Sequence, residues 1–197
     1  MSSPANPGSA ASDPPRVFAL SSRLLHWLMA AMILAMLAIG FAMVVSLADY
    51  HRLVSIHRPL GIAILVLAFI RFVNRLFHPL PPFPATMSSQ ERLIATASEY
   101  LMYFFMFALP LVGWGMLSAA RYPIVLFGPI HLPFILPHDL ALHALLRRLH
   151  TILAYAFFIT FCAHFSAVLF HTLVLRDGLL WRMAPGPSKQ PGQHDQR

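Results

Sequence analysis

The sequence predicts an all-α integral membrane protein, a four-helix bundle whose helices run up, down, up and down. Three observations support this prediction. The 197 residues are 58% hydrophobic and only 11% charged, with a mean hydropathy of +0.67, whereas a soluble domain carries about 25% charged residues. Long apolar runs recur along the chain, and four spans of about 20 residues would use roughly 80 residues. Several histidines lie inside these runs.

Four apolar runs are long enough to cross a bilayer as helices. We expect them from Ser21 through Ala48, over 56–76, over 100–119 and over 142–175. A short connection over 49–55 separates the first two, and the letters SSQE at 88–91 are typical of a helix start. The segment 121–140 is apolar but contains four prolines. We therefore expect it to lie at the membrane surface or to fold back over the bundle.

The two ends of the chain are polar and rich in proline. They predict disordered tails over 1–19 and 184–197, on either side of one membrane domain over 20–183. The first tail lacks the basic start and apolar core of a signal peptide.

The basic residues indicate a membrane protein rather than a nucleic-acid-binding one. The formal charge is +7, but arginines stand mostly at the ends of apolar runs, and the aromatic residues lie inside those runs. If the N-terminus is cytoplasmic, nine of the 14 basic residues fall on that side. The other five are Arg52, Arg58, Arg121, Arg147 and Arg148. This bias predicts both termini in the cytoplasm.

Four histidines lie inside the apolar runs: His26, His57, His150 and His164. An ionisable side chain at hydrocarbon depth indicates a functional site, and neutral imidazole is the commonest metal ligand among side chains. His150 and His164 are 14 residues apart, almost four helical turns, so they share a face and stand about 21 Å apart along the axis. Because the hydrocarbon core is about 30 Å thick, one lies toward each side of the bilayer.

Depth then selects the partners of these two histidines. His26 stands near the cytoplasmic start of the first run, at the depth of His164, and His57 stands near the outer start of the second run, at the depth of His150. Antiparallel helices therefore predict the pairs His26/His164 and His57/His150, as axial ligands of two haem irons roughly 20 Å apart. Such a protein would be a transmembrane electron carrier. Zinc is the alternative metal, although it prefers one compact four-ligand cluster.

Cys162 is the only cysteine in the chain. A single cysteine excludes an internal disulfide, an iron–sulfur cluster held by four cysteines and a CxxCH haem attachment. The haem would therefore be b-type, held without a covalent bond.

Other residues near the four histidines give weaker evidence for a haem site. Gly61 and Ala154 each follow a predicted ligand by one turn and would let a flat macrocycle approach the helix, with ordinary helix packing as the alternative. His143 and His171 share the helical stripe of His150 and His164 but lie at or beyond the bilayer edges. They are the fallback ligands.

Several stretches of the sequence are similar to one known family. They are RLLHWLMA, IHRPLGIAILVLAFIRFVNRL, YLMYFFMFALPLVGWGM, HTILAYAFFITFCAHF and LRDGLLWRMAP, which together span most of residues 20–185. On these stretches the chain resembles the bacterial cytochrome b561 family. The resemblance implies a four-helix protein of the bacterial inner membrane that binds two haem b groups through His26, His57, His150 and His164. It also implies electron exchange with the quinone pool, and in one member type superoxide is the donor on the outer side. Some relatives have a histidine where Glu99 stands.

Arginines near the predicted haems have two interpretations each. Arg58 is next to His57 and is a candidate partner for a haem propionate. Arg71 and Arg75 are candidate contacts of the inner haem or of a quinone. The alternative for all three is that they are charges at the membrane boundary. Arg121, Arg147 and Arg148 would make the outer face cationic and could steer an anion such as superoxide toward it. The alternative is that they anchor lipid phosphates or haem propionates.

Three functions follow from this sequence. The first is a quinone-linked oxidoreductase, such as a superoxide oxidase. The second is a haem b membrane anchor that relays electrons to or from a separate redox subunit or soluble cytochrome. The third is a haem-free membrane scaffold or transporter, which would show no haem absorption.

Overall fold

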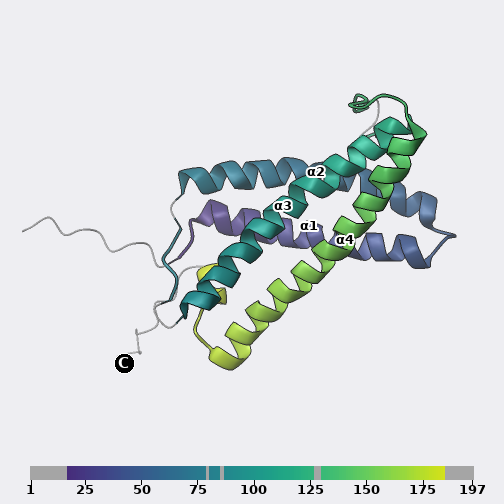
Figure 1. The fold of residues 1–197 in the computed structure, drawn as a ribbon. Helices are drawn as coiled ribbons and strands as arrows, with labels where there is room; N and C mark the ends of the chain where they lie inside the picture. Colours follow the sequence, from purple (N-terminus) through teal and green to yellow (C-terminus); the bar gives the residue numbers. More distant parts are fainter. Residues whose placement is uncertain (1–16, 79, 85–86, 127–129, 185–197) are drawn as a thin grey trace, which may run out of the picture.

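The computed structural model describes residues 17–78, 80–84, 87–126 and 130–184, and these residues form an all-helical fold (Figure 1). Its long helices are α1 (Leu20–Val45), α2 (Tyr50–Phe77), α3 (Ser89–Ala119) and α4 (Leu140–Leu169). A π-helical turn, η1 (Phe170–Leu175), prolongs α4, and a 3-10 turn, η2 (Leu180–Arg182), follows it. Most of the two predicted disordered tails falls outside the described residues.

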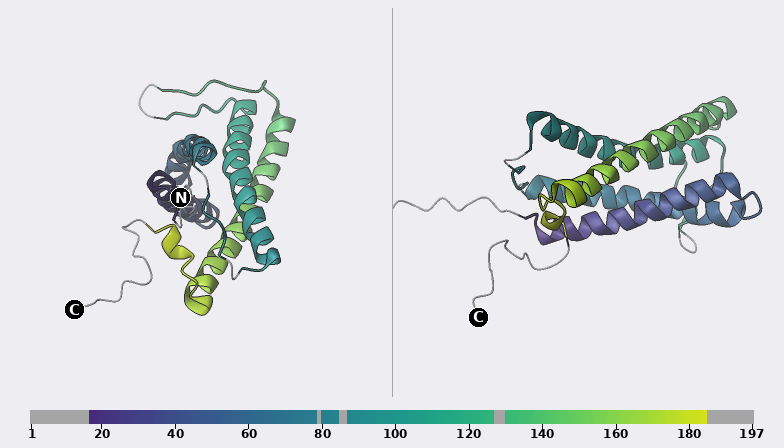
Figure 2. Two further views of the ribbon diagram at one scale, coloured as in Figure 1. Left: turned by 90° about the vertical axis from the view of Figure 1, so that its left-hand side faces the viewer. Right: turned by 90° about the horizontal axis from the view of Figure 1, so that it is seen from below.

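The four long helices form two antiparallel hairpins. α1 lies beside α2, α3 lies beside α4, and the second pair crosses the first obliquely (Figures 1 and 2). α2 and α3 join the two hairpins by direct packing. The Phe18 N–H donates to the Arg182 carbonyl at 3.2 Å, so the residue before α1 and the 3-10 turn after α4 meet at one end of the bundle. The predicted up-down-up-down membrane bundle is confirmed.

The helix boundaries correct one prediction and confirm another. The expected connection over 49–55 is wrong, because α2 already begins at Tyr50. The Ser46 hydroxyl donates to Asp49 at 2.9 Å. This hydrogen bond closes a short turn between α1 and α2. The helix start expected at 88–91 is confirmed by a capping box, in which Ser88 and Glu91 each bond the other's backbone N–H.

In the proline-containing segment, the described residues 121–126 and 130–139 are non-helical and pack on the end of α3, which agrees with the second of the two predicted arrangements, whereas residue 140 already belongs to α4. Val125 and His131 form an isolated antiparallel bridge within it. The indole of Trp114 donates to the Pro133 carbonyl at 2.9 Å, and the Ile135 N–H donates to the Ser118 hydroxyl at 3.2 Å. The segment therefore covers one end of the bundle, here called the outer end; the opposite end, which holds both described chain ends, is called the inner end.

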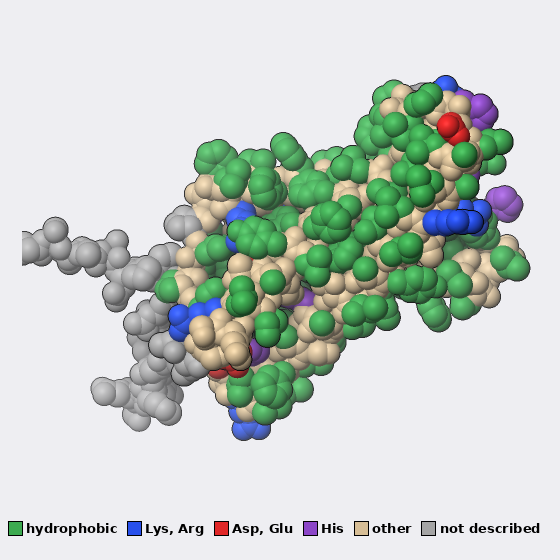
Figure 3. Space-filling model, viewed as in Figure 1, with side chains coloured by type: hydrophobic (Ala, Val, Ile, Leu, Met, Phe, Trp, Pro, Cys, Tyr) green, Lys and Arg blue, Asp and Glu red, His purple; other side chains and the backbone are tan. Residues whose placement is uncertain are grey.

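The core lies midway along the bundle, and much of the outside of the bundle is also apolar. The core residues come from all four helices: Met29, Ile33, Ile64, Leu67, Ala68, Tyr103, Phe105, Met106 and Phe157. Figure 3 shows hydrophobic side chains along the length of the molecule, with charged groups mainly toward its ends. All four helices are long and apolar enough to cross a membrane, and the exposed apolar surface is what lipid chains would cover.

Candidate functional site

The outer end of the bundle brings His57 and His150 together. His57 stands in the second turn of α2 and His150 in the third turn of α4. Their ring centroids are 6.3 Å apart and their planes are inclined at 70°. The Nδ1 atoms of both rings are buried without a hydrogen-bond partner. A buried polar atom without a partner needs an explanation, and a group bound between the two rings would supply one.

Gly113 of α3 sets the space around His150. A Cβ atom at Gly113 would stand 3.3 Å from Cε1 of His150, closer than ordinary van der Waals contact. The sequence pattern did not single out Gly113, although it lies in a Gly-Trp-Gly stretch of a membrane helix, where small residues often mark a close approach. Gly61 instead faces α1, since its Cβ would stand 3.7 Å from Met36. This contact favours ordinary helix packing for Gly61.

The inner end brings His26 of α1 toward His164 of α4. His26 and His164 lie near each other, and Arg71 of α2 lies near both. The Ser98 hydroxyl is 3.5 Å from Nδ1 of His164. The Arg71 guanidinium lies 5.9 Å from the Tyr103 ring centroid and so adds a fixed positive charge beside the pair.

A turn formed by residues 177–184 closes the inner end beside His26. The indole N–H of Trp27 donates to the Met183 carbonyl at 2.8 Å, and Arg23 donates to the Ala184 carbonyl at 2.9 Å. Trp27 also makes an edge contact with the His26 ring, at 5.9 Å between centroids. No sequence pattern indicated the two hydrogen bonds to this turn, because they join residues more than 150 positions apart.

The arginines singled out from the sequence have different surroundings. The Nε atom of Arg58 is buried without a hydrogen-bond partner, which fits an anionic group beside His57. Arg75 forms an ion pair with Glu99, so it links α2 to α3. Arg121 stacks on Phe134, with 5.0 Å between its guanidinium carbon and the ring centroid.

The two fallback histidines already have hydrogen bonds. Nδ1 of His143 lies 2.9 Å from the Met116 carbonyl, and Nδ1 of His171 lies 2.5 Å from Asp177. Both therefore have local structural roles at the two ends of α4. Core side chains, including the Phe105 and Phe157 rings at 5.5 Å, separate the two histidine pairs.

The residues present fit two bis-histidine haem sites better than one metal cluster. Within the described residues, no group of three or more His, Cys, Asp or Glu side chains gathers as a zinc site would require. Each pair instead offers two imidazoles from different helices. The outer pair has buried Nδ1 atoms without partners and the close-fitting Gly113, and an arginine lies near each pair, which suits a flat anionic macrocycle.

Fold and site together define a multi-pass helical membrane protein with paired histidines at two depths. The family model for prokaryotic cytochrome b561 matches residues 17–186. The chain therefore belongs to the prokaryotic cytochrome b561 family, and membership implies haem b and electron transport.

The alignments with three named relatives cover much of the chain. Cytochrome b561 homolog 2 of Escherichia coli (strain K12) is 30% identical over 182 residues, which are 90% of this chain and 96% of the relative. Probable superoxide oxidase CybB of Yersinia pestis is 32% identical over 134 residues, 66% of this chain and 73% of the relative. Cytochrome b561 homolog 1 of Escherichia coli (strain K12) is 29% identical over 133 residues.

Proposed function

We propose that this protein is a di-haem b oxidoreductase that moves single electrons between a donor at its outer face and the quinone pool. The observation that supports this most directly is the gathering of four histidines into two pairs at two depths. His57 and His150 would hold the outer haem, and His26 and His164 the inner one. An iron held by two histidines exchanges single electrons and has no open coordination position.

The chain's own residues would hold and orient these groups. Arg58 would pair its buried Nε with a propionate of the outer haem, and Arg71 would add a positive charge at the inner one. The buried Phe105 and Phe157 rings would exclude water from the space between the pairs. Superoxide is the donor that we propose, since a relative is named a probable superoxide oxidase.

Haem content tests the site assignment. The purified chain should contain two haem b groups by pyridine haemochrome, with a low-spin reduced-minus-oxidised spectrum. His57→Ala and His164→Ala should each retain one haem, and the double variant none. His143→Ala is the matched control and should retain two, because His143 already bonds the Met116 carbonyl. A haem-free wild-type chain would contradict the proposal.

Quinone reduction separates an enzyme from an electron relay. The purified chain, supplied with superoxide and a soluble ubiquinone analogue, should reduce the quinone without another protein. If reduction occurs only after a second redox protein is added, the chain is a membrane anchor for that protein. In both cases we propose the bacterial inner membrane as its location, with both termini in the cytoplasm.

A further inference from the structure

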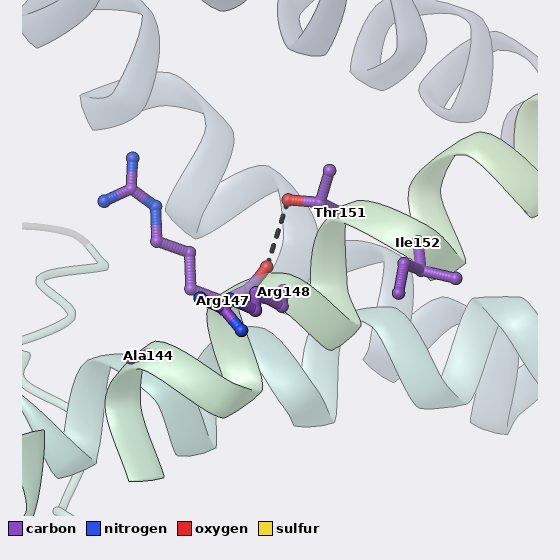
Figure 4. Close-up of a pocket in the computed structure, with 5 residues that line it drawn as sticks. All are labelled: Ala144, Arg147, Arg148, Thr151 and Ile152. Atoms are coloured by element: carbon purple, nitrogen blue, oxygen red, sulfur yellow. Dashed lines mark hydrogen bonds between the residues drawn. The ribbon is translucent and has the colours of Figure 1, made fainter. Parts of the chain in front are cut away.

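One face of α4 has a cationic groove near the outer end. Ala144, Arg147, Arg148, Thr151 and Ile152 line it (Figure 4). Their spacing of three and four residues places them on a single helix face. The groove therefore belongs to the surface of α4 alone.

The two guanidinium groups in this groove are not neutralised. In the described ranges, neither Arg147 nor Arg148 has a side-chain hydrogen bond or an ion pair. Asp139, the acidic residue closest in sequence, accepts hydrogen bonds from the N–H groups of Ala141 and Leu142 as the helix N-cap. The Thr151 hydroxyl donates to the Arg147 carbonyl at 3.0 Å, as the dashed line in Figure 4 shows. The groove therefore offers two positive charges and no negative one.

This face of α4 points away from α3 and from the histidine pair. α3 meets α4 on the other side, where Gly113 faces His150 and Phe105 packs on Phe157. From the arginines toward the inner end, the same face of α4 carries Ile152, Tyr155 and Ile159, whose exposed fractions are 65%, 62% and 68%. A charged groove next to an exposed apolar stripe is complementary to a phospholipid. The head group would bind in the groove, and the acyl chains would lie along the helix.

We infer that Arg147 and Arg148 bind the phosphate of an anionic phospholipid, whose acyl chain lies along Ile152, Tyr155 and Ile159. Arginine binds phosphate oxygens in a bidentate manner, and an unbalanced pair of guanidinium groups favours a lipid with net negative charge. The site also accounts for the position of these two arginines, which lie on the non-cytoplasmic side in the orientation predicted from the other basic residues. It does not depend on the haems or on quinone.

Native mass spectrometry of the full-length protein tests this inference. With phosphatidylglycerol added in detergent, the wild type should retain bound lipid, and each of Arg147→Gln and Arg148→Gln should lower apparent affinity about fivefold. The affinity of the double variant should fall roughly 25-fold, because the contributions of the two arginines multiply. Arg52→Gln removes a charge from the same end of the bundle and should leave binding unchanged. Phosphatidylcholine should bind weakly to every variant.

Three results would overturn the inference. The first is equal phosphatidylglycerol affinity in the wild type and the double variant. The second is displacement of the lipid by millimolar inorganic phosphate alone, which would indicate a free-anion site. The third is loss of a dimer in the double variant with lipid binding unchanged, because the groove would then be a contact between two copies.

Discussion

Gly113 shows how one missing side chain shapes the outer site. A Cβ at this position would stand 3.3 Å from His150, so we expect Gly113→Val to displace the imidazole and to reduce the protein to about one haem per chain. Gly40→Val is the matched control, because a Cβ at Gly40 meets nothing within 4 Å. Pyridine haemochrome quantification checks both variants. A Gly113→Val protein with two haems would mean that α3 yields at this contact.

Asp177 gives a prediction with a defined pH dependence. Burial of its carboxylate opposes ionisation, but hydrogen bonds from His171 and from the Leu179 N–H outweigh burial and hold the pKa of Asp177 below its ordinary value of 3.8. A pKa that is depressed in the folded state adds stability above the ordinary value, and this stability is lost as the pH falls through the folded pKa.

The wild type should therefore melt at a higher temperature than Asp177→Asn at pH 7. The difference should shrink as the pH falls below 3.8. Thermal unfolding of both proteins from pH 7 to pH 3 measures it. A difference that stays constant over this range would show that Asp177 does not act through its charge.

At the scale of elements, the start of α4 depends on Asp139. Its carboxylate accepts from Ala141 N–H at 2.8 Å and from Leu142 N–H at 3.0 Å. Replacing an N-cap acceptor by alanine costs about 1 kcal/mol, so Asp139→Ala should lower the free energy of unfolding by about this amount. Asp139→Asn keeps an acceptor oxygen and should lose less. Denaturation in mixed detergent compares the three proteins, and equal stability of all three would exclude a capping role.

Some elements could be predicted from the sequence because local rules determine them. The periodicity of a helix places His150 and His164 on one face, and chain order alone puts His57 at the depth of His150. The start of α2 was misplaced, because a bond between Ser46 and Asp49 shortens the turn. Gly113 and the turn over 177–184 were missed for another reason. The Gly-Trp-Gly stretch marks a close approach at Gly113, but the partners of Gly113 and of the turn are distant in sequence, and no local pattern identifies them.

At the scale of the whole molecule, the charge bias predicts orientation. Phe18 bonds Arg182, so the start of α1 and the turn that follows α4 share one end of the bundle, and nine of the 14 basic residues belong to the predicted cytoplasmic side. A green fluorescent protein fused after Arg197 should therefore fluoresce in a bacterial cell, and alkaline phosphatase fused there should be inactive. Phosphatase inserted in the 46–49 turn should be active. The reverse pattern would place the lipid-binding arginines, Arg147 and Arg148, in the cytoplasmic leaflet. The proposed donor would then approach from the cytoplasm, so topology decides which compartment supplies the electrons.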